Sequence, residues 1–327
     1  MNRRAFLGAT GAAAASLTAG CIGSGIVGGS RTVTLDYAYY NPVSLVLREK
    51  GWVGEEFEDS DASVEWVLSL GSNQANQYSQ SGEAQAASTA GIAALMARSN
   101  GVPIRTGYIY SRPEWTALVA KSSSDISEVA DLEGKSVAAT LGTDPHFFLL
   151  QALDTAGLSE SDVDIVDLQH PEGQDALLQD EVDAWAGLDP HMAELQLEHD
   201  VELFFRRPEF NTNGTLNFLE GFLQNHPEDV NRVLRAYERG REWAIENPEE
   251  TVSILASASE MSKPVARKVF TDRTDLSAPI PGDQHRSLLS DLAPILQEKG
   301  FVDSSVDLQA AIDELVRPSI SESVVNG

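Results

Sequence analysis

The chain has 327 residues, with 50 acidic and 23 basic side chains and a formal net charge of −27; only six of the basic residues are lysines. This length exceeds what one small core supports, so we expect two lobes. A strongly acidic, lysine-poor chain argues against nucleic acid or an anionic membrane face as a partner. The acidic residues are spread along the sequence, which indicates a solvated coat rather than an acidic tail.

The first 20 residues have the pattern of an export signal. Arg3 and Arg4 precede a weakly apolar run, 8–19, that is too short to span a bilayer. This arrangement resembles a twin-arginine signal, and the small residues before Cys21, the only cysteine, resemble a lipobox. We therefore predict a lipoprotein signal over 1–20, lipidation at Cys21 and a Gly/Ser-rich tether over 21–31. A plain export signal with an unrelated cysteine is the alternative.

The folded part is expected to begin at Thr32, and strands and helices alternate from there. We predict strands from β-branched, aromatic or small apolar runs and helices from their polar or periodic faces. In chain order these are strand 32–39, helix 43–50, strand 64–68, helix 74–81, strand 84–87, helix 91–99, and strands 104–109 and 116–120.

The same alternation continues through the middle of the chain, and the last third is predicted to be helical. The expected strands are 137–139, 163–168, 183–186, 201–205 and 215–219. The expected helices are 145–156, 174–180, 190–197, 227–246, 248–257, 263–270, 282–300 and 305–315, with 319–327 frayed. Strand–helix alternation at this spacing favours an α/β fold with parallel sheets covered by helices.

One stretch of the middle segment has the form of a ligand-binding turn. A short strand ends before Gly142, which frees the backbone, and Thr143 or Asp144 can cap a helix that starts at Pro145. A helix that opens from such a loop directs free N–H groups and a positive dipole end at whatever lies in front of it. An ordinary turn between a strand and a helix is the alternative.

Several short motifs in a fixed order give a family resemblance. The run 131–138, D-L-E-G-K-S-V-A, resembles the start of the second lobe in type II solute-binding proteins of ABC importers. The run 142–146, G-T-D-P-H, resembles the G-S-x-x-H helix opening of the aliphatic sulfonate, nitrate and taurine binders, a family that includes binders of thiamine pyrimidine precursors. The runs 182–191 and 81–90 resemble two further family motifs, and the likeness extends from Thr32 to about Ser257. The acidic, lysine-poor composition also resembles that of proteins from salt-loving archaea.

The resemblance implies a type II periplasmic-binding-protein fold with two lobes joined by two crossover segments, near 116–121 and 205–212. Lobe 1 would comprise 32–118 plus 208–318, and lobe 2 would comprise 119–207. A small solute would bind in the cleft, and the lobes would close over it by a hinge motion. The implied partner is an ABC permease in the membrane, and we expect a lipid-anchored monomer on the outer face of the cytoplasmic membrane.

The resemblance also suggests which residues contact the solute, each with a structural alternative. Tyrosines after the first strand can instead be core residues, hydroxyl groups and Asp189 can be helix caps, and His146 shares a helical stripe with leucines. The candidate ligand-binding residues are Tyr39, Tyr40, Asn41, Ser88, Thr89, Ala90, Gly142, Thr143, Asp144, His146, Trp185, Asp189 and Asn213.

Two departures from the family pattern bear on the ligand. The first contact loop, Ser88-Thr89-Ala90-Gly91, lacks the acidic residue and proline of sulfonate binders, and Asp144 adds a carboxylate at the helix opening. A negative charge there would suit a zwitterion, a cation or a neutral ring better than a plain anion. The expected solute is thus of the sulfonate or nitrate class, or a thiamine-precursor pyrimidine.

Other functions were weighed against this one. Related folds include enzymes of pyrimidine and menaquinone biosynthesis, which the export signal disfavours, and a tethered solute sensor is a further alternative. The histidines show no HExxH or CxxC spacing, and the sequence contains no GxSxG motif or phosphate-binding loop. We therefore expect no metal, no cofactor and no catalytic activity.

Overall fold

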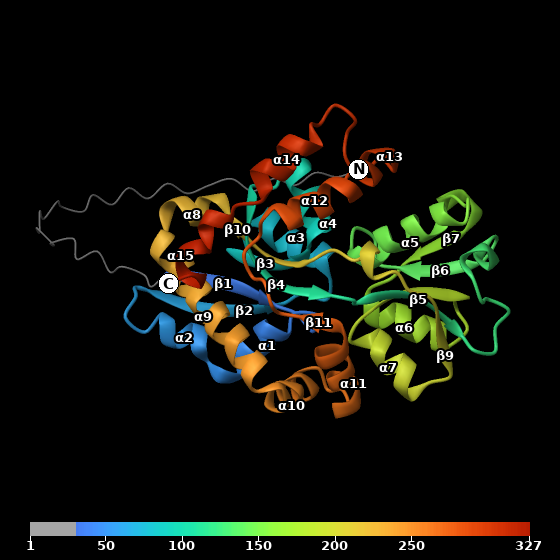
Figure 1. The fold of residues 1–327 in the computed structure, drawn as a ribbon, viewed down its shortest axis with the longest axis horizontal. Helices are drawn as coiled ribbons and strands as arrows, with labels where there is room; N and C mark the ends of the chain where they lie inside the picture. The colour runs from blue at the N-terminus through green and yellow to red at the C-terminus, as the bar shows by residue number, and fades with distance from the viewer. Residues whose placement is uncertain (1–30) are drawn as a thin grey trace, which may run out of the picture. The chain divides into compact units, whose positions relative to one another are not determined.

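The computed structural model describes residues 31–327. The predicted export signal, the lipidation site Cys21 and the tether up to residue 30 lie outside the described residues. Two mixed sheets, each covered by helices, form two lobes joined by two crossover segments (Figure 1). The α/β, type II periplasmic-binding-protein fold expected from the sequence is confirmed.

The first lobe is built on a six-stranded sheet whose strand order is β11-β4-β10-β3-β1-β2. Its central strand β3 is buried along its whole length, as small apolar residues allow between two helical layers. The strands are β1 Arg31–Tyr37, β2 Ala62–Leu68, β3 Ala86–Ala90, β4 Ile104–Pro113, β10 Gly214–Leu219 and β11 Thr274–Asp275.

The second lobe is built on a five-stranded sheet with the order β7-β6-β8-β5-β9. Helix α5 lies on one face and α6 and α7 on the other (Figure 1), and each face has its own apolar cluster. The strands are β5 Thr116–Lys121, β6 Ser136–Ala139, β7 Asp164–Asp167, β8 Ala184–Leu188 and β9 Val201–Phe205; the helices are α5 Asp144–Thr155, α6 His170–Leu178 and α7 His191–Glu198.

Helices cover both faces of the first sheet (Figure 1). On one side lie α1 Pro42–Lys50, α2 Trp52–Glu56, α9 Pro227–Glu246 and α10 Pro248–Ala258, and on the other α3 Ser72–Ser81, α4 Gly91–Ser99, α12 Asp283–Leu292, α13 Pro294–Glu298 and α14 Leu308–Leu315. Helices α8 Glu220–Asn225, α11 Lys263–Arg267 and α15 Glu322–Val325 complete the lobe.

The expectation of parallel sheets is wrong for three strands: β11, which pairs antiparallel with β4, and the two strands that follow a crossover, β10 and β5. Strand β10 pairs antiparallel with β3 and β4, and β5 pairs antiparallel with β8 and β9. These are the strands that directly follow a crossover. The parallel strands of each sheet end at the side that faces the other lobe. A chain that arrives from the other lobe enters the sheet at this same side, so its first strand runs in the opposite direction.

The two crossovers are short segments between the sheets. The first is Glu114-Trp115, between β4 and β5, and the second is 206–213, between β9 and β10. The expected first crossover, near 116–121, is itself strand β5, because β-branched and apolar residues there pair with β8.

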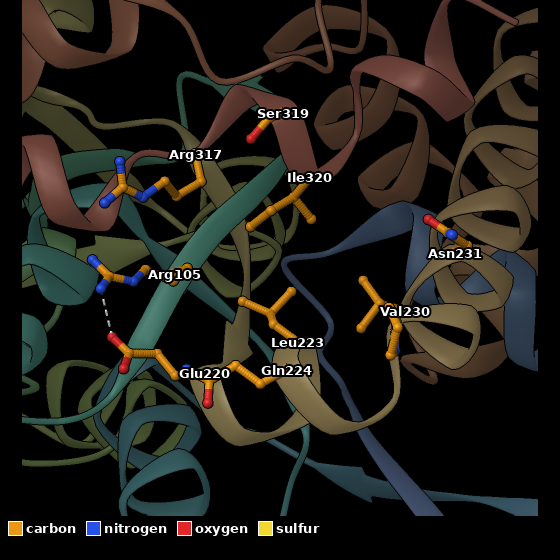
Figure 2. Close-up of a pocket in the computed structure, with 10 residues that line it drawn as sticks. Arg105, Glu220, Leu223, Gln224, Val230, Asn231, Arg317, Ser319 and Ile320 are labelled. Atoms are coloured by element: carbon orange, nitrogen blue, oxygen red, sulfur yellow. Dashed lines mark ion pairs between the residues drawn. The ribbon is translucent and has the colours of Figure 1, made fainter.

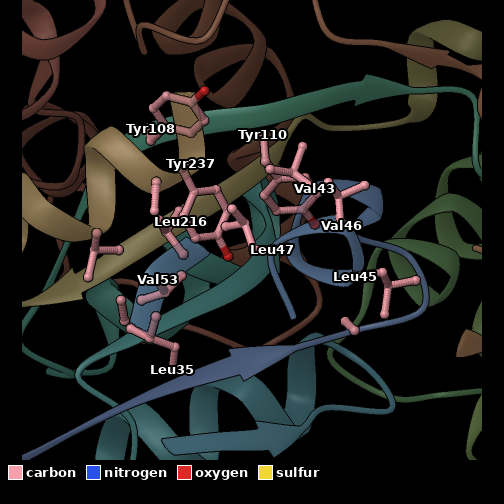
Figure 3. Close-up of a cluster of buried hydrophobic side chains, with 14 of the residues drawn as sticks. Leu35, Val43, Leu45, Val46, Leu47, Val53, Tyr108, Tyr110, Leu216 and Tyr237 are labelled. Atoms are coloured by element: carbon pink, nitrogen blue, oxygen red, sulfur yellow. The ribbon is translucent and has the colours of Figure 1, made fainter. Parts of the chain in front are cut away.

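The core of the first lobe is an apolar cluster between the sheet and α1 and α9. Val43, Val46 and Leu47 line one stripe of α1 and pack against Tyr108 and Tyr237 (Figure 3). This i, i+3, i+4 spacing follows the 3.6-residue helical period. Each such buried side chain contributes about 1.5–3 kcal/mol to folding.

The lobes also share an apolar cluster. Phe147 and Leu150 of α5 are buried together with Ile92 and Leu95 of α4 and Leu289 of α12. Since α5 belongs to the second lobe and the other two helices to the first, the lobes are in direct contact in this structure.

The C-terminal region differs from expectation at three places. The predicted helix 282–300 is divided into α12 and α13 at Pro294, because proline lacks the N–H that a continuous helix requires. The helix predicted over 263–270 becomes α11 followed by one turn of π-helix, Lys268–Asp272. The tail 319–327 is not frayed: it forms α15, and Val324 and Val325 pack on the first-lobe core.

None of the helices within residues 31–327 combines the length and apolar character needed to cross a membrane.

Candidate functional site

Two small cavities lie side by side where the lobes meet. Tyr40 from the first lobe and His170 and Leu188 from the second line both of them. Each has a volume of about 10 Å³, roughly the room that one water molecule needs. The first cavity is completed by Ser72, Ala90, Trp115, Thr143, Asp144 and Pro145, and the second by Tyr39, Ser69, Leu70, Asp189, Pro190 and His191.

Five helices begin at these cavities. Ser72 is the first residue of α3, Ala90 precedes α4, Thr143 precedes α5, His170 is the first residue of α6, and Pro190 precedes α7. Each helix start carries backbone N–H groups without intrahelical partners and roughly half a positive charge. Helix starts from both lobes therefore direct positive potential at one small volume, which is an arrangement suited to an anion.

The two acidic side chains at the cavities are fully engaged by protein groups. Asp144 accepts hydrogen bonds from Trp115 Nε1 at 2.6 Å, from the Thr212 N–H at 2.9 Å and from Thr212 Oγ1 at 2.7 Å. Trp115 and Thr212 lie on the two crossovers, so this carboxylate ties the start of α5 to both. Burial raises the pKa of Asp144 above its ordinary value, and the hydrogen bonds from Thr212 and Trp115 oppose that rise.

Asp189 forms a buried ion pair with Arg273. Arg273 Nη1 lies 2.8 and 2.9 Å from the two carboxylate oxygens, and the Ala193 N–H caps one of them at 3.0 Å. Burial raises the pKa of Asp189, and Arg273 opposes the rise. Neither acid has a free oxygen for a ligand cation. Arg273 compensates the charge of Asp189, whereas the partners of Asp144 are neutral donors that do not compensate its charge. That Asp144 disfavours a plain anion stays a prediction.

The histidines at the cavities are neutral. Burial lowers the pKa of His170 to about 3 and that of His191 to about 4. Among the described residues that line the two cavities, none is a lysine or an arginine. The positive potential therefore comes from backbone N–H groups rather than from charged side chains.

Six of the residues predicted from the sequence line the cavities: Tyr39, Tyr40, Ala90, Thr143, Asp144 and Asp189. The phenol of Tyr40 is fixed by donating a hydrogen bond to the Ser88 carbonyl at 3.0 Å, and its ring meets Trp115 edge-on. That these residues contact a solute stays a prediction.

Three predicted first-lobe residues have structural partners instead. Asn41 caps α1 by accepting from the Ser44 N–H at 3.1 Å. Ser88 donates to the buried Asp36 carboxylate at 2.8 Å, and Thr89 accepts from Asn217 at 2.8 Å inside the sheet. The alternative of capping and packing fits these positions, because their polar atoms are satisfied within the lobe.

Three more predicted residues lie near the lobe interface without lining the cavities. Gly142 has a φ of 75°, and its N–H donates to His146 Nδ1 at 3.3 Å. The His146 ring packs on Phe147 and edge-on against Phe301, and burial lowers the pKa of His146 to about 4. Asn213 lies on the second crossover, with its Nδ2 3.0 Å from His285 Nδ1.

The expectation for Trp185 has to be corrected. Its indole is completely buried in the second-lobe cluster under α6 and lines neither cavity. Trp185 is the second residue of β8, and Leu188, three residues later, is the one that reaches the cavities. At about 3.3 Å per residue, the indole lies one layer below the carboxyl end of the strand.

The sequence reasoning missed Ser69, Ser72 and His170. His170 had a usable signal: Gln169-His170-Pro171 follows a strand and places a proline in the first helical turn, as Asp144-Pro145 does. The predicted helix begins only at Gln174, so the prediction does not include this helix start. Ser69 follows β2 directly and carried no pattern of its own.

A larger hollow lies on the surface of the first lobe, away from the second (Figure 2). Its volume is about 390 Å³, and Leu223, Val230 and Ile320 form an apolar floor. Arg105 on its wall is paired with Glu220 at 2.9 Å. This groove belongs to one lobe only, so closure of the lobes cannot enclose a solute in it.

The described part of the chain gathers no group of three or more His, Cys, Asp or Glu side chains that could hold a metal ion.

Comparison with known proteins shows the family of the chain. The family described as NMT1/THI5 like matches residues 44–251, well over half of the chain. The chain belongs to the NMT1/THI5-like family.

Among curated relatives are two putative aliphatic sulfonates-binding proteins. The one from Escherichia coli is 23% identical over 77% of this chain and 80% of its own length, and the one from Bacillus subtilis is 22% identical over 86% of each. The alkanesulfonate-binding protein SsuA from Xanthomonas axonopodis pv. citri, bound to MOPS, has the same fold with a TM-score of 0.78 at 19% identity, over 86% of this chain and 97% of the other.

One relative is an enzyme. The 4-amino-5-hydroxymethyl-2-methylpyrimidine phosphate synthase of Legionella pneumophila is 25% identical over 71% of this chain and 74% of its own length. The chain is therefore similar both to binding proteins and to at least one enzyme.

Proposed function

We propose that this chain is the solute-binding component of an ABC importer and that it captures a small oxoanion, foremost an aliphatic sulfonate, between its lobes. The observation that carries the proposal is the meeting of five helix starts from two lobes at cavities lined by no lysine or arginine. Sulfonate-binding relatives over most of the chain support the same class of solute.

The proposed mechanism is capture without chemistry. Each cavity holds about one water molecule, so the lobes must separate to admit an organic solute. Backbone N–H groups at the helix starts would then bind the sulfonate oxygens, and closure about Glu114-Trp115 and 206–213 would remove solvent. The closed form would deliver the solute, unchanged, to a membrane permease.

We also propose that the protein is exported and held at the outer face of the cytoplasmic membrane by a lipid on Cys21, as a monomer. The support is the sequence pattern around Arg3, Arg4 and Cys21. The lobe bounds expected from the sequence are 32–118 plus 208–318 and 119–207. With the crossovers at 114–115 and 206–213, we propose instead that lobe 1 comprises about 31–113 plus 214–327 and lobe 2 about 116–205.

Ligand-induced stabilisation tests the proposal. An alkanesulfonate at 100 times its Kd should stabilise the protein by about 2.7 kcal/mol, while the corresponding neutral alcohol should leave the melting temperature unchanged. The solute should be recovered chemically unchanged after prolonged incubation, as NMR of the mixture would show. Conversion of the solute, or of a pyrimidine precursor, would favour the enzyme alternative instead.

A charge placed at one helix start sharpens the test. Ser72→Asp adds a negative charge at the start of α3 and should abolish sulfonate binding by repulsion, while its carboxylate can still accept from the Ala90 N–H as the Ser72 hydroxyl does. Asn247→Asp places the same charge at the start of α10, which lines neither cavity, and should bind as the unmodified protein does. Equal binding by Ser72→Asp would remove α3 from the site.

A further inference from the structure

His170 is an unpaired polar group at the centre of the candidate site. It is the first residue of α6, its side chain is 1% exposed, and it lines both cavities. Its Nδ1 lies 3.1 Å from Thr140 Oγ1, whereas its Nε2 has no hydrogen-bond partner among the described residues. A buried nitrogen without a partner is costly unless something enters the cavity to meet it.

The partners of Thr140 decide which ring nitrogen carries the proton. The Thr140 hydroxyl has a single proton and donates it to the Leu168 carbonyl at 2.7 Å. Thr140 Oγ1 is therefore left as an acceptor, so His170 Nδ1 must carry the hydrogen that joins them. In the neutral ring, His170 Nε2 is then a bare acceptor on a side chain that lines both cavities.

The charged form of the ring is disfavoured. Burial lowers the pKa of His170, and the neighbouring His191 lowers it further. His191 has the same arrangement: its Nδ1 is 2.8 Å from Gln174 Oε1, and the Gln174 amide donates to Glu194 at 2.7 Å. The acids of the second cavity do not offset this, since Asp189 is paired with Arg273.

Ser69 presents a buried hydroxyl from the other lobe. It lines the second cavity, and its side chain faces the buried Asp36 carboxylate, whose pKa it lowers. A hydroxyl group and the N–H groups at the helix starts can each donate a hydrogen bond to an anion. The Nε2 of His170 carries no hydrogen in this tautomer, so it cannot. A solute bearing only anionic oxygens would leave Nε2 unpaired and facing negative charge.

We propose that the solute carries an N–H or O–H donor in addition to its anionic group, and that His170 Nε2 accepts this donor's hydrogen bond. The class is therefore an amino- or hydroxy-substituted sulfonate rather than a simple alkanesulfonate. This inference rests on the proposed function, because it names the group that the same solute carries in addition to its sulfonate.

Three sulfonates of matched size test the assignment by calorimetry. 2-Aminoethanesulfonate and 2-hydroxyethanesulfonate carry a donor where propane-1-sulfonate carries a methyl group, and the hydroxyl compound separates the donor from added charge. The unmodified protein should bind both donor compounds about tenfold more tightly than propane-1-sulfonate, the value of one buried hydrogen bond.

His170→Phe keeps an aromatic ring but removes the acceptor. It should weaken binding of the two donor compounds about tenfold and leave propane-1-sulfonate unaffected, so that the preference disappears. His199→Phe is the matched control, because His199 is exposed at the end of α7 and lines neither cavity; it should keep the preference. His170→Gln, whose amide oxygen can accept, should restore part of it.

The ring itself provides a readout that does not depend on the variants folding. In the free protein, 15N NMR should show His170 protonated on Nδ1 and bare on Nε2, and only the donor compounds should shift the Nε2 signal towards a hydrogen-bonded value. A proton on Nε2 in the free protein would overturn the inference, and so would proton uptake on binding propane-1-sulfonate.

The two proposals fail differently. If the unmodified protein binds none of the three sulfonates, the proposed function is wrong. If it binds all three equally, or if His170→Phe weakens all three alike, the role assigned to His170 is wrong while the proposed function stands.

Discussion

Asp36 is a buried carboxylic acid at the end of strand β1, one layer behind the cavities. Ser88 donates to its Oδ1 through the backbone N–H at 2.7 Å and the hydroxyl at 2.8 Å. Burial raises the pKa of Asp36 from 3.8 to about 7, and the hydrogen bonds from Ser88 and Ser69 offset only part of this rise. The group therefore titrates near neutral pH.

The raised pKa of Asp36 predicts a pH-dependent stability term. Between about pH 4 and pH 7 the folded state holds a proton that the unfolded state has lost, so the contribution of Asp36 to the unfolding free energy falls with rising pH, by up to ~1.4 kcal/mol per pH unit. Asp36→Asn cannot titrate. Its stability relative to the unmodified protein should therefore rise across this window and level off above it, as urea unfolding at a series of pH values would measure.

The Asp36→Asn variant has to be compared with the unmodified protein, because buried histidines change the unfolding free energy with pH in the opposite direction to Asp36. The pKa of His146 is lowered to about 4 and that of His285 to about 3, so the unfolded state takes up protons first as the pH falls. Their stabilising contribution is present above about pH 6.5 and is lost as the pH falls towards 4. A stability difference between Asp36→Asn and the unmodified protein that stays constant with pH would show that Asp36 does not titrate there.

Helix α6 approaches β8 closely because Gly173 has no side chain. A Cβ at this position would lie 2.5 Å from Trp185 Nε1 and 2.8 Å from Trp185 Cδ1. The indole is fully buried among apolar neighbours and has no room to move aside. The glycine and the tryptophan therefore set the spacing between helix and sheet together.

Gly173→Ala should destabilise the protein by about 1–3 kcal/mol, because overpacking against the indole outweighs the better helix propensity of alanine. Gly221→Ala in α8 is the matched control. Nothing lies within 4 Å of a Cβ there, so its stability should be unchanged or raised by up to ~1 kcal/mol. Urea unfolding of both variants measures the two changes in unfolding free energy. Equal changes would mean that the Trp185 indole moves aside for the added methyl group.

At the scale of the whole folded region, a segment of the first lobe contacts the second lobe through a buried ion pair and an apolar patch. Arg273, between the π-turn and β11, is 5% exposed and pairs with the buried Asp189 of the second lobe. Beside this pair, Val265 and Val269 pack on Ala193 of α7, and the Ser262 hydroxyl donates to Glu198 at 2.6 Å. Opening of the cleft at this side must break all of these contacts.

Arg273→Gln should shift the protein towards an open form. Removing one partner of a buried ion pair costs about 3–5 kcal/mol if the other stays buried, and separation of the lobes would let water reach Asp189. Small-angle scattering should therefore show a larger radius of gyration without solute. The double variant Asp189→Asn, Arg273→Gln should regain part of the lost stability. A loss of stability with an unchanged radius would mean that the pair supports folding but does not hold the lobes closed.

The elements of the fold were largely predictable because the signals for them are local. Prolines and capping residues marked the helix starts at α1, α5 and α9, and small or β-branched runs marked β1, β3 and β6. The sheet order of the two lobes was not predictable from these signals. The direction of β5 and β10 depends on which lobe the chain has just left.

The sequence by itself determined the strand–helix order, the family and one helix start at the candidate site, 142–146, because each depends on neighbouring residues. Only the tertiary structure decided which polar atoms remain unpaired at the cavities. Asp144 is satisfied by Thr212, 68 residues away, while the Nε2 of His170 has no partner among the described residues. The physical reason is that hydrogen-bond partners across the lobes are set by how the two crossovers bring distant strands and helices together.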